Sequence, residues 1–414
     1  MAEYSASWLK DLRSSQFVTA YHRGVEAGNL PFFRNAESLL DPVVTMEGEP
    51  RLMLGSPNYL GLASHPRVVA GAKAAVDRYG TSLTGSRILN GTTALHRELE
   101  EELADWLGVE ETLLFTTGFQ TNIGTISALV GVGDTVVSDS FAHASMLDGV
   151  GLSRAKLRGF RHNRMDLFVD SVRRAKADGG RILVILDGLY SMEGDLPPLD
   201  EMLDICQEND AAVMLDEAHS LGVLGEQGTG AAEVFGVQDR IDIRMGALSK
   251  ALAGVGGFIA GSRELINYLQ VTARSFVFTT VGVPAALGGS LEAVRIRRSE
   301  EGAQLAEELR RNSRFLRTEL KGLGLPMGPD SDLPERTTPI IPVILGDDDL
   351  AMEWWRQLYD RGVFTGVALY PGVPPTGAML RICPMATHTR AQLERALEVF
   401  AEVQKVMRRK AGTP

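Results

Sequence analysis

Apolar positions in the middle of the chain follow two alternating patterns. Between about residues 60 and 290, stretches with helical spacing, such as Pro66–Tyr79 and Ala94–Leu107, are separated by short continuous apolar runs. Continuous apolar strands that alternate with helices are typical of a mostly parallel sheet covered on both faces. We therefore expect an α/β fold with a large sheet, whose strands are predicted at residues 112–115, 135–137, 182–186, 212–215, 241–245 and 257–260.

The two ends of the chain have different patterns. Residues 1–45 carry apolar side chains at helical spacing until Pro31 interrupts them, and residues 51–54 are expected to form a short strand. Later elements are predicted at residues 299–323, 340–345, 349–361, 379–383 and 390–406. The expected parts are an N-terminal arm with a short strand (1–59), a large domain (60–295) and a smaller α+β domain (296–414).

Charge and composition argue against some classes of binding partner and some locations of the protein. The 414 residues carry a formal net charge of −11, which disfavours nucleic acid or an anionic membrane as the main partner. No apolar run approaches the ~20 residues of a membrane span, and the first ten residues lack the apolar core of a signal peptide. The two cysteines, Cys206 and Cys383, provide no disulfide framework. We therefore expect a cytoplasmic protein.

A lysine and an acid follow two neighbouring strands of the predicted sheet. Asp216 ends one apolar run, and Lys250 comes after the next in a turn of small residues and glycines. Burial disfavours an ammonium group, so Lys250 is placed to lose its proton and attack an aldehyde. Asp216 could hold a pyridinium nitrogen, and this pair is what pyridoxal phosphate (PLP) requires of a protein. Either residue alone is more often structural, but two strand ends at one edge of a sheet favour a ligand site.

Eight short segments, in a fixed order from about residue 52 to residue 400, identify a resemblance to a known family. The chain resembles the α-oxoamine synthases, which are PLP enzymes with the aspartate-aminotransferase-like (type I) fold. Each segment is weak evidence alone, but together they are specific for the family, though not for one member of it. The segments are residues 58–61, 85–87, 117–122, 139–143, 190–195, 216–222, 249–250 and 381–389.

The resemblance implies a role for each matching side chain. Lys250 would hold the cofactor and serve as the base at the α-carbon of the substrate, while Asp216 would bind the ring nitrogen and His219 would lie near the phenolic oxygen. His143 would stack on the ring, and Arg381 would bind the carboxylate of the amino acid. The other positions implied are Gly118, Phe119, Ser191, Ser249, Thr279 and Thr280 for the cofactor and Asn58 for the substrate. No metal site is expected.

Two positions depart from the pattern of the family. Many relatives have a threonine at the position of Ala247, and its hydroxyl binds phosphate, so one donor is lost here unless Ser249 or a water replaces it. Relatives often have an arginine at the position of Leu369, which in some members meets the carboxylate of the substrate. The amino acid used, or the way it triggers the reaction, could therefore differ in this chain.

The resemblance implies a decarboxylative condensation of a small amino acid with an acyl thioester, which gives an α-amino ketone, carbon dioxide and free thiol. The thioester could be an acyl-CoA or an acyl carrier protein, in general or specialised biosynthesis. The activity could be like that of 8-amino-7-oxononanoate synthase or serine palmitoyltransferase, and 2-amino-3-ketobutyrate ligase and 5-aminolevulinate synthase are the other members of the family that stay open. In this family the 279–280 region reaches the neighbouring subunit, which implies a homodimer.

Three alternatives stay open. The first is an aminotransferase on the same fold. The second is a non-catalytic partner subunit, which the presence of Lys250 disfavours. The third is a transcriptional regulator, which would need a DNA-binding module, and residues 1–45 are too few and not basic enough to form one.

Overall fold

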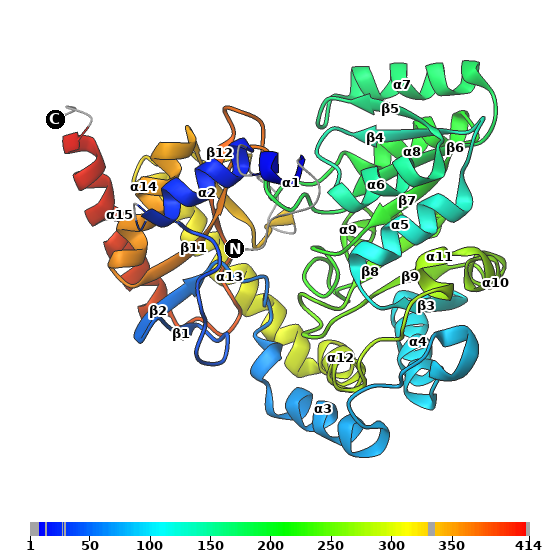
Figure 1. The fold of residues 1–414 in the computed structure, drawn as a ribbon, viewed down its shortest axis with the longest axis horizontal. Coiled ribbons are helices and arrows are strands. Elements are labelled where there is room, and N and C mark those ends of the chain that lie inside the picture. The colour runs from blue at the N-terminus through cyan, green and yellow to red at the C-terminus, as the bar shows by residue number, and fades with distance from the viewer. Residues whose placement is uncertain (1–7, 13–14, 27, 29, 330–335, 411–414) are drawn as a thin grey trace.

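Seven strands form the larger of two sheets (Figure 1). The structure is a computed structural model that describes residues 8–12, 15–26, 28, 30–329 and 336–410. The strand order is β3-β9-β8-β7-β6-β4-β5, and every neighbouring pair is parallel except the two that involve β9. The expectation of a mostly parallel sheet is confirmed. The strands are β3 (Glu111–Phe115), β4 (Thr135–Asp139), β5 (Lys156–Phe160), β6 (Ile182–Asp187), β7 (Ala212–Asp216), β8 (Ile243–Ala247) and β9 (Gly257–Gly261).

Alternate residues of the central strands serve the two faces of this sheet. On β6, Leu183 and Ile185 pack in one apolar cluster with residues of α5, α6 and α10, whereas Val184 and Leu186 pack in another with residues of α7 and α8. Both faces are therefore covered, which explains why β6 is a continuous apolar run. The helices of this part are α3 (Pro66–Tyr79), α4 (Ala94–Leu107), α5 (Gly118–Leu129), α6 (Ala144–Ser153), α7 (Met165–Asp178), α8 (Leu199–Glu208), α9 (Ala231–Val234), α10 (Arg263–Thr272), α11 (Arg274–Val277) and α12 (Pro284–Arg297), with shorter turns at Leu62–Ser64, Arg87–Gly91 and Gln238–Arg240.

Strand β5 is not predicted by the sequence pattern. It lies at the edge of the sheet beside β4, and Phe160 is its only fully buried residue. Lys156 and Arg158 both pair with Asp178 of α7 near the surface. Polar and charged residues are common on edge strands because they prevent pairing with other chains. The strand therefore lacks the apolar run by which the other strands are recognised.

The smaller sheet combines strands from both ends of the chain. Its order is β1-β2-β11-β12-β10, and β2 runs parallel to β11 while the other pairs are antiparallel. The predicted strand at residues 51–54 is thus part of the same sheet as the C-terminal strands. The elements are β1 (Val43–Met46), β2 (Glu49–Leu54), β10 (Ile341–Gly346), β11 (Val363–Ala368), β12 (Ala378–Ile382), α13 (Glu300–Gly322), α14 (Asp348–Asp360) and α15 (Arg390–Lys410).

The predicted N-terminal arm is described only in part. Helices α1 (Trp8–Asp11) and α2 (Gln16–Glu26) are present, while residues 1–7, 13–14, 27 and 29 lie outside the described residues. Large apolar side chains on this arm are exposed, including Trp8, Leu12 and Tyr21. Exposed apolar side chains gathered on one segment are typical of a surface that another chain covers.

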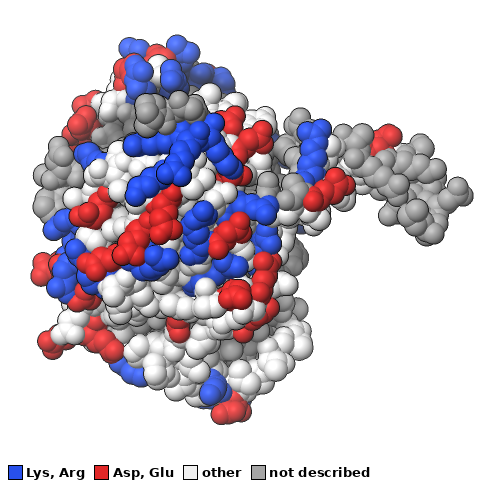
Figure 2. All heavy atoms as spheres, turned by 90° about the vertical axis from the view of Figure 1, so that its left-hand side faces the viewer, with Lys and Arg blue, Asp and Glu red and all other residues white. Residues whose placement is uncertain are grey.

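The face formed by the C-terminal elements carries both signs of charge. Figure 2 shows basic and acidic side chains interspersed over this face. On α15, Arg390 pairs with Glu394 and Arg395 pairs with Glu398, each at 2.9 Å. Such exposed helix pairs contribute only about 0.3–0.5 kcal/mol each. Among the helices of the described residues, none combines the length and the apolar character needed to cross a membrane.

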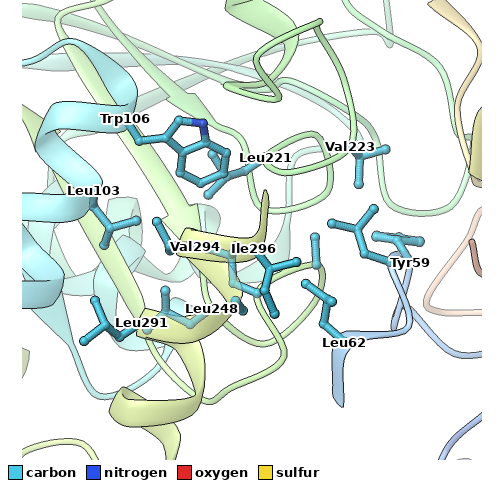
Figure 3. Close-up of a cluster of buried hydrophobic side chains, with 14 of the residues drawn as sticks. Tyr59, Leu62, Leu103, Trp106, Leu221, Val223, Leu248, Leu291, Val294 and Ile296 are labelled. Carbon is cyan, nitrogen blue, oxygen red and sulfur yellow. The ribbon is translucent and has the colours of Figure 1, made fainter. Parts of the chain in front are cut away.

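A large apolar cluster anchors the turn that carries Lys250. Leu248 is fully buried, and Figure 3 shows it among side chains of α4, of α12 and of the segment around Tyr59. The backbone of Leu248 donates to the carbonyl of Gly256 (3.0 Å) and accepts from Gly254 (2.8 Å). Complete burial of a leucine is worth about 1.5–3 kcal/mol, so the turn is fixed by packing as well as by hydrogen bonds. Lys250 therefore projects from a rigid base.

Candidate active site

The carboxyl ends of β6, β7 and β8 meet at one edge of the larger sheet, where ligands bind in open α/β folds. Asp187 and Asp216 are paired residues at the ends of β6 and β7. A cavity of about 320 Å³ lies at this edge. Seven of the residues predicted for the site line it together: Gly118, Phe119, His143, Asp216, His219, Ser249 and Lys250.

Lys250 has the properties of a nucleophilic amine. Desolvation by burial lowers the pKa of Lys250 below its ordinary value; the charge of Asp216 opposes this shift, and the charge of Arg381 adds to it. A lower pKa increases the fraction of neutral amine, which is the form that attacks a carbonyl carbon. The turn that follows requires glycine at Gly256, whose φ of +146° is rarely adopted by other residues.

Two carboxyl groups lie side by side at the strand ends. Asp216 Oδ2 accepts a hydrogen bond from Asn122 Nδ2 (2.8 Å), and its Oδ1 accepts one from the backbone of Ala218 (2.9 Å). Asp187 is also buried, and both this burial and the charge of Asp216 raise the pKa of Asp187 well above its ordinary value. This direction favours the protonated form of the Asp187 carboxyl, and both residues line the cavity.

His143 is the N-cap residue of α6 and is held by two contacts. Its backbone N–H donates to Asp187 Oδ2 (3.2 Å), and its Nδ1 shares a hydrogen bond with Ser145 Oγ (2.7 Å). The edge of its ring faces the ring of Phe119, with centroids 6.4 Å apart. These contacts fix the plane of the imidazole against the cavity, as is needed for stacking on a flat ligand.

His219 is kept neutral by its surroundings. Burial lowers the pKa of His219 well below its ordinary value, and the charges of Lys250 and Arg381 lower it further. Its Nδ1 lies 2.7 Å from Tyr59 Oη, which in turn accepts from Arg381 (3.4 Å). Because Tyr59 Oη already accepts from Arg381, its O–H is the donor to Nδ1, and this assignment places the proton of the neutral ring on Nε2. The histidine can therefore donate one hydrogen bond to an oxygen in the cavity.

The first turn of α5 also lines the cavity. The helix begins at Gly118, and Thr117 caps it by accepting from the backbone of Gln120 (3.1 Å). First-turn amides have no acceptor within their own helix, so those of Gly118 and Phe119 are available to an anion. A Cβ on Gly118 would lie 3.2 Å from Met245 Cε, so the position leaves little room for a side chain.

The remaining predicted residues lie outside the lining of this cavity. Ser191 contributes its backbone carbonyl, which accepts from Arg381 Nε at 2.5 Å. Asn58 is buried and bonds to the backbone of Leu40 and Ala63 (3.2 and 3.3 Å). Thr279 and Thr280 lie behind the α5 turn, where they bond to Gln120 and Thr116, respectively. Contacts of these residues with cofactor or substrate stay predictions.

Four residues of the site were not singled out by sequence reasoning. Asp187 ends an apolar run in the same way as Asp216, so the same strand-end argument could have found it. Tyr59 and Asn122 lie in the matching segments 58–61 and 117–122 but were given no role, and no local pattern marks Ser145; the partners of all three are on other elements.

The chain was compared with known proteins. The family model for class I and II aminotransferases matches residues 49–400. Serine palmitoyltransferase of Sphingobacterium spiritivorum is 40% identical over 91% of this chain and 92% of its own length. The 8-amino-7-oxononanoate synthase of Thermoanaerobacter pseudethanolicus is 39% identical over 89% of this chain and 91% of its own length. This chain belongs to the α-oxoamine synthases of the class I and II aminotransferase family.

The fold of this α-oxoamine synthase agrees with solved structures. Serine palmitoyltransferase from S. paucimobilis, solved with PLP–myriocin bound, superposes with a TM-score of 0.91 at 31% identity, covering 96% of this chain and 98% of that one. The expectation of an aspartate-aminotransferase-like fold is therefore confirmed.

Proposed function

We propose that this synthase condenses a small amino acid with an acyl thioester, using PLP, and releases carbon dioxide and free thiol. The observation that carries the proposal is the meeting of Lys250, Asp216 and the free amides of α5 at one cavity. These residues fit the aldehyde, the ring nitrogen and the phosphate of PLP, respectively. When bound, PLP supplies an electron sink that stabilises negative charge at the α-carbon of an attached amino acid.

The residues of the chain orient the amino acid and move its proton. Arg381 is fixed by Ser191 and Tyr59, and its guanidinium can bind the carboxylate of the amino acid at two points. The neutral amine of Lys250 accepts the proton from the α-carbon. The ring of His143 lines the cavity and restricts where the reacting carbon can lie. A C–C bond to the acyl carbon then forms as the C–S bond breaks and the thiolate leaves. The carboxylate is lost as carbon dioxide, and the proton held by Lys250 returns to the α-carbon, which gives the α-amino ketone.

We further propose that the enzyme is a homodimer. Thr279 and Thr280 lie in a segment with exposed apolar side chains, among them Phe278, which is 73% exposed. Leu89, on the neighbouring turn, is 83% exposed. A second copy that covers this surface would bring the two threonines to the cavity of its partner. The acyl donor, either acyl-CoA or an acyl carrier protein, would enter beside this surface, and we place the reaction in the cytoplasm.

The names of the relatives suggest two amino acids as the substrate, serine and alanine. A serine palmitoyltransferase joins serine to a palmitoyl group. In 8-amino-7-oxononanoate the amino carbon bears only a methyl group at the end of the chain, which corresponds to a decarboxylated alanine. The two kinds of relative are almost equally similar to this chain, so identity does not decide between serine and alanine.

A thiol-release screen tests the proposal. Purified enzyme with PLP is given glycine, alanine or serine together with acyl-CoA or acyl carrier protein thioesters of several lengths, and free thiol is measured. We expect one amino acid to release thiol and carbon dioxide in equal amounts. Lys250→Ala should lower this rate by at least about 10³-fold and abolish the visible absorbance of the bound cofactor. Exchange of amino groups with a keto acid, without release of thiol, would instead establish an aminotransferase.

A further inference from the structure

His162 bridges two carboxylates beside the active site, although no step of the proposed reaction uses it. Its Nδ1 lies 3.1 Å from Asp139 Oδ1, and its Nε2 lies 3.0 Å from Asp195 Oδ2. The histidine follows β5, while Asp139 ends β4 and Asp195 lies in the loop after β6. The side chains are at most 17% exposed, so water screens the contacts only weakly.

The first carboxylate belongs to the loop that carries His143. Asp139 Oδ1 also accepts from the backbone of Phe141 (2.8 Å), and its Oδ2 accepts from the backbone of Asn163 (3.1 Å). The ring of Phe141 stacks on that of His162, with centroids 4.6 Å apart and planes inclined by 22°. His143 comes two residues after Phe141. The imidazole of His162 therefore supports the loop from which His143 enters the cavity wall.

The second carboxylate belongs to the loop that holds Arg381. The backbone carbonyl of Asp195 accepts from the N–H of Tyr190 (3.0 Å), which closes the loop around Ser191. The carbonyl of Ser191 is the acceptor for Arg381 Nε. The ring of Tyr190 meets the ring of His162 edge-on, with centroids 4.4 Å apart. A shift of Asp195 would therefore displace the carbonyl that orients the guanidinium.

We propose that His162 is a positioning residue that clamps the His143 loop (139–143) to the Ser191 loop (190–195) and so fixes His143 relative to Arg381. The clamp requires both ring nitrogens to donate at once, because each carboxylate is only an acceptor. Burial lowers the pKa of His162, but the hydrogen bonds and charges of Asp139 and Asp195 outweigh this and raise the pKa to about 10. The imidazolium form, with two N–H donors, thus persists at neutral pH.

The test compares His162→Gln with wild type in the full-length enzyme with PLP. The amide of glutamine can donate to one of the two carboxylates, but it is uncharged and cannot donate to both as the imidazolium does. Amide hydrogen exchange is expected to increase in residues 139–143 and 190–195 and to stay unchanged in β7, β8 and β9 of the larger sheet. The kinetic part of the test rests on the proposed function: kcat is expected to fall about 10-fold and the KM for the amino acid to rise, while the KM for the thioester stays unchanged.

His65→Gln serves as the matched control. His65 also contacts a carboxylate, Glu301, at 3.0 Å, but it lies at the start of α3 and is not part of either loop. This variant should leave exchange in both loops and the KM for the amino acid unchanged. Loosening of both loops by His65→Gln would show that the effect is not specific to the clamp and would overturn the inference.

A second set of variants separates a clamp from general stabilisation. Asp195→Asn should loosen only residues 190–195. The double variant Asp195→Asn/His162→Gln should be no less active than the less active of the two single variants, because both changes break the same link between the loops. Additive losses, a uniform rise in exchange, or unchanged loops in His162→Gln would each overturn the inference. If His162→Gln does not fold, Asp195→Asn alone still tests the inference. Hydrogen exchange needs no substrate. If His162→Gln loosens both loops but the wild-type enzyme releases no thiol, the proposed reaction is refuted and the clamp is not.

Discussion

Asp216 and Glu217 are neighbours in the sequence, but their carboxylates lie in different surroundings. Asp216 lines the cavity and accepts one hydrogen bond at each oxygen. Glu217 is packed in the protein interior, where its oxygens accept from the backbone of Ala231 (2.7 Å) and Ala232 (3.0 Å), and from the hydroxyl of Ser220. Successive side chains of an extended segment point to opposite sides, so adjacent acids can be separated in this way.

The comparison separates a charge used for chemistry from a charge used for stability. Glu217 lies 3.9 Å from the guanidinium of Arg244, and both side chains are 2% exposed. Its acceptor capacity is filled by groups of the protein, which offsets the cost of burying the charge. Asp216 accepts only one hydrogen bond at each oxygen, so it has lone pairs left for a ligand in the cavity. A charge at the cavity is therefore held in place without being fully paired.

Of the changes that test this comparison, Asp216→Asn is expected to have the largest effect, and the effect is on catalysis. The variant keeps the size of the side chain but removes the charge that would keep the ring nitrogen of PLP protonated. We expect thiol release to fall roughly 10²–10³-fold, which corresponds to about 3–4 kcal/mol, with the midpoint of urea unfolding little changed. Steady-state kinetics and denaturation of the same preparation measure both quantities. Activity near that of wild type would show that this carboxylate has no role in the chemistry.

Glu217→Gln should produce the opposite pattern. The change leaves Arg244 buried without its partner charge and weakens the hydrogen bonds from Ala231 and Ala232. The free energy of unfolding is expected to fall by about 3 kcal/mol, while kcat per folded molecule stays near that of wild type. Urea unfolding followed by circular dichroism measures the loss. Should kcat fall more than stability predicts, the proposed division between the two acids would fail.

His162 represents a third case, in which one cation is shared by two carboxylates. Its pKa is raised from 6.5 to about 10 on folding, so its contribution to stability is complete below pH 6.5 and is lost as the pH rises through about 10. The titratable groups that face it are Asp139, Asp195, Glu193 and Tyr190. The stability difference between wild type and His162→Gln should therefore shrink between pH 6.5 and pH 10, as measured by urea unfolding at several pH values. A difference independent of pH would show that the histidine is not charged.

The sequence predicts those parts of the site that local pattern marks. Asp216 follows an apolar run, and Lys250 stands in a turn of small residues, so both could be found without the structure. Tyr59 lies in a segment that matches the family, but its contact with His219 could not be predicted, because the two residues are 160 positions apart in the chain. Strand β11 was also not predicted: its buried and partly exposed residues do not follow a continuous run, and Gly366 interrupts them. Contacts between distant segments are fixed by packing rather than by local pattern.

Ala247 and Leu248 are a second pair of sequence neighbours of which one lines the cavity and the other is packed in the interior. Ala247 lines the cavity near the first turn of α5, whereas Leu248 is fully buried in the apolar cluster. A Cβ on Gly118 would lie 3.6 Å from Ala247 Cβ, so a side chain at position 247 is close to the amides expected to bind phosphate. Ala247→Thr would add a hydroxyl donor there, and we expect PLP to bind about 5-fold more tightly, which corresponds to about 1 kcal/mol.

The matched control for this change is Ala247→Val, which has the shape of threonine without the hydroxyl. If the hydroxyl is the cause, valine should bind PLP no better than alanine, and less well if the added methyl groups crowd Gly118. Equilibrium titration of the apoenzyme, followed by cofactor absorbance, measures the three affinities. Equal gains for threonine and valine would mean that packing against α5, rather than a lost phosphate donor, limits the affinity at this end of the cavity.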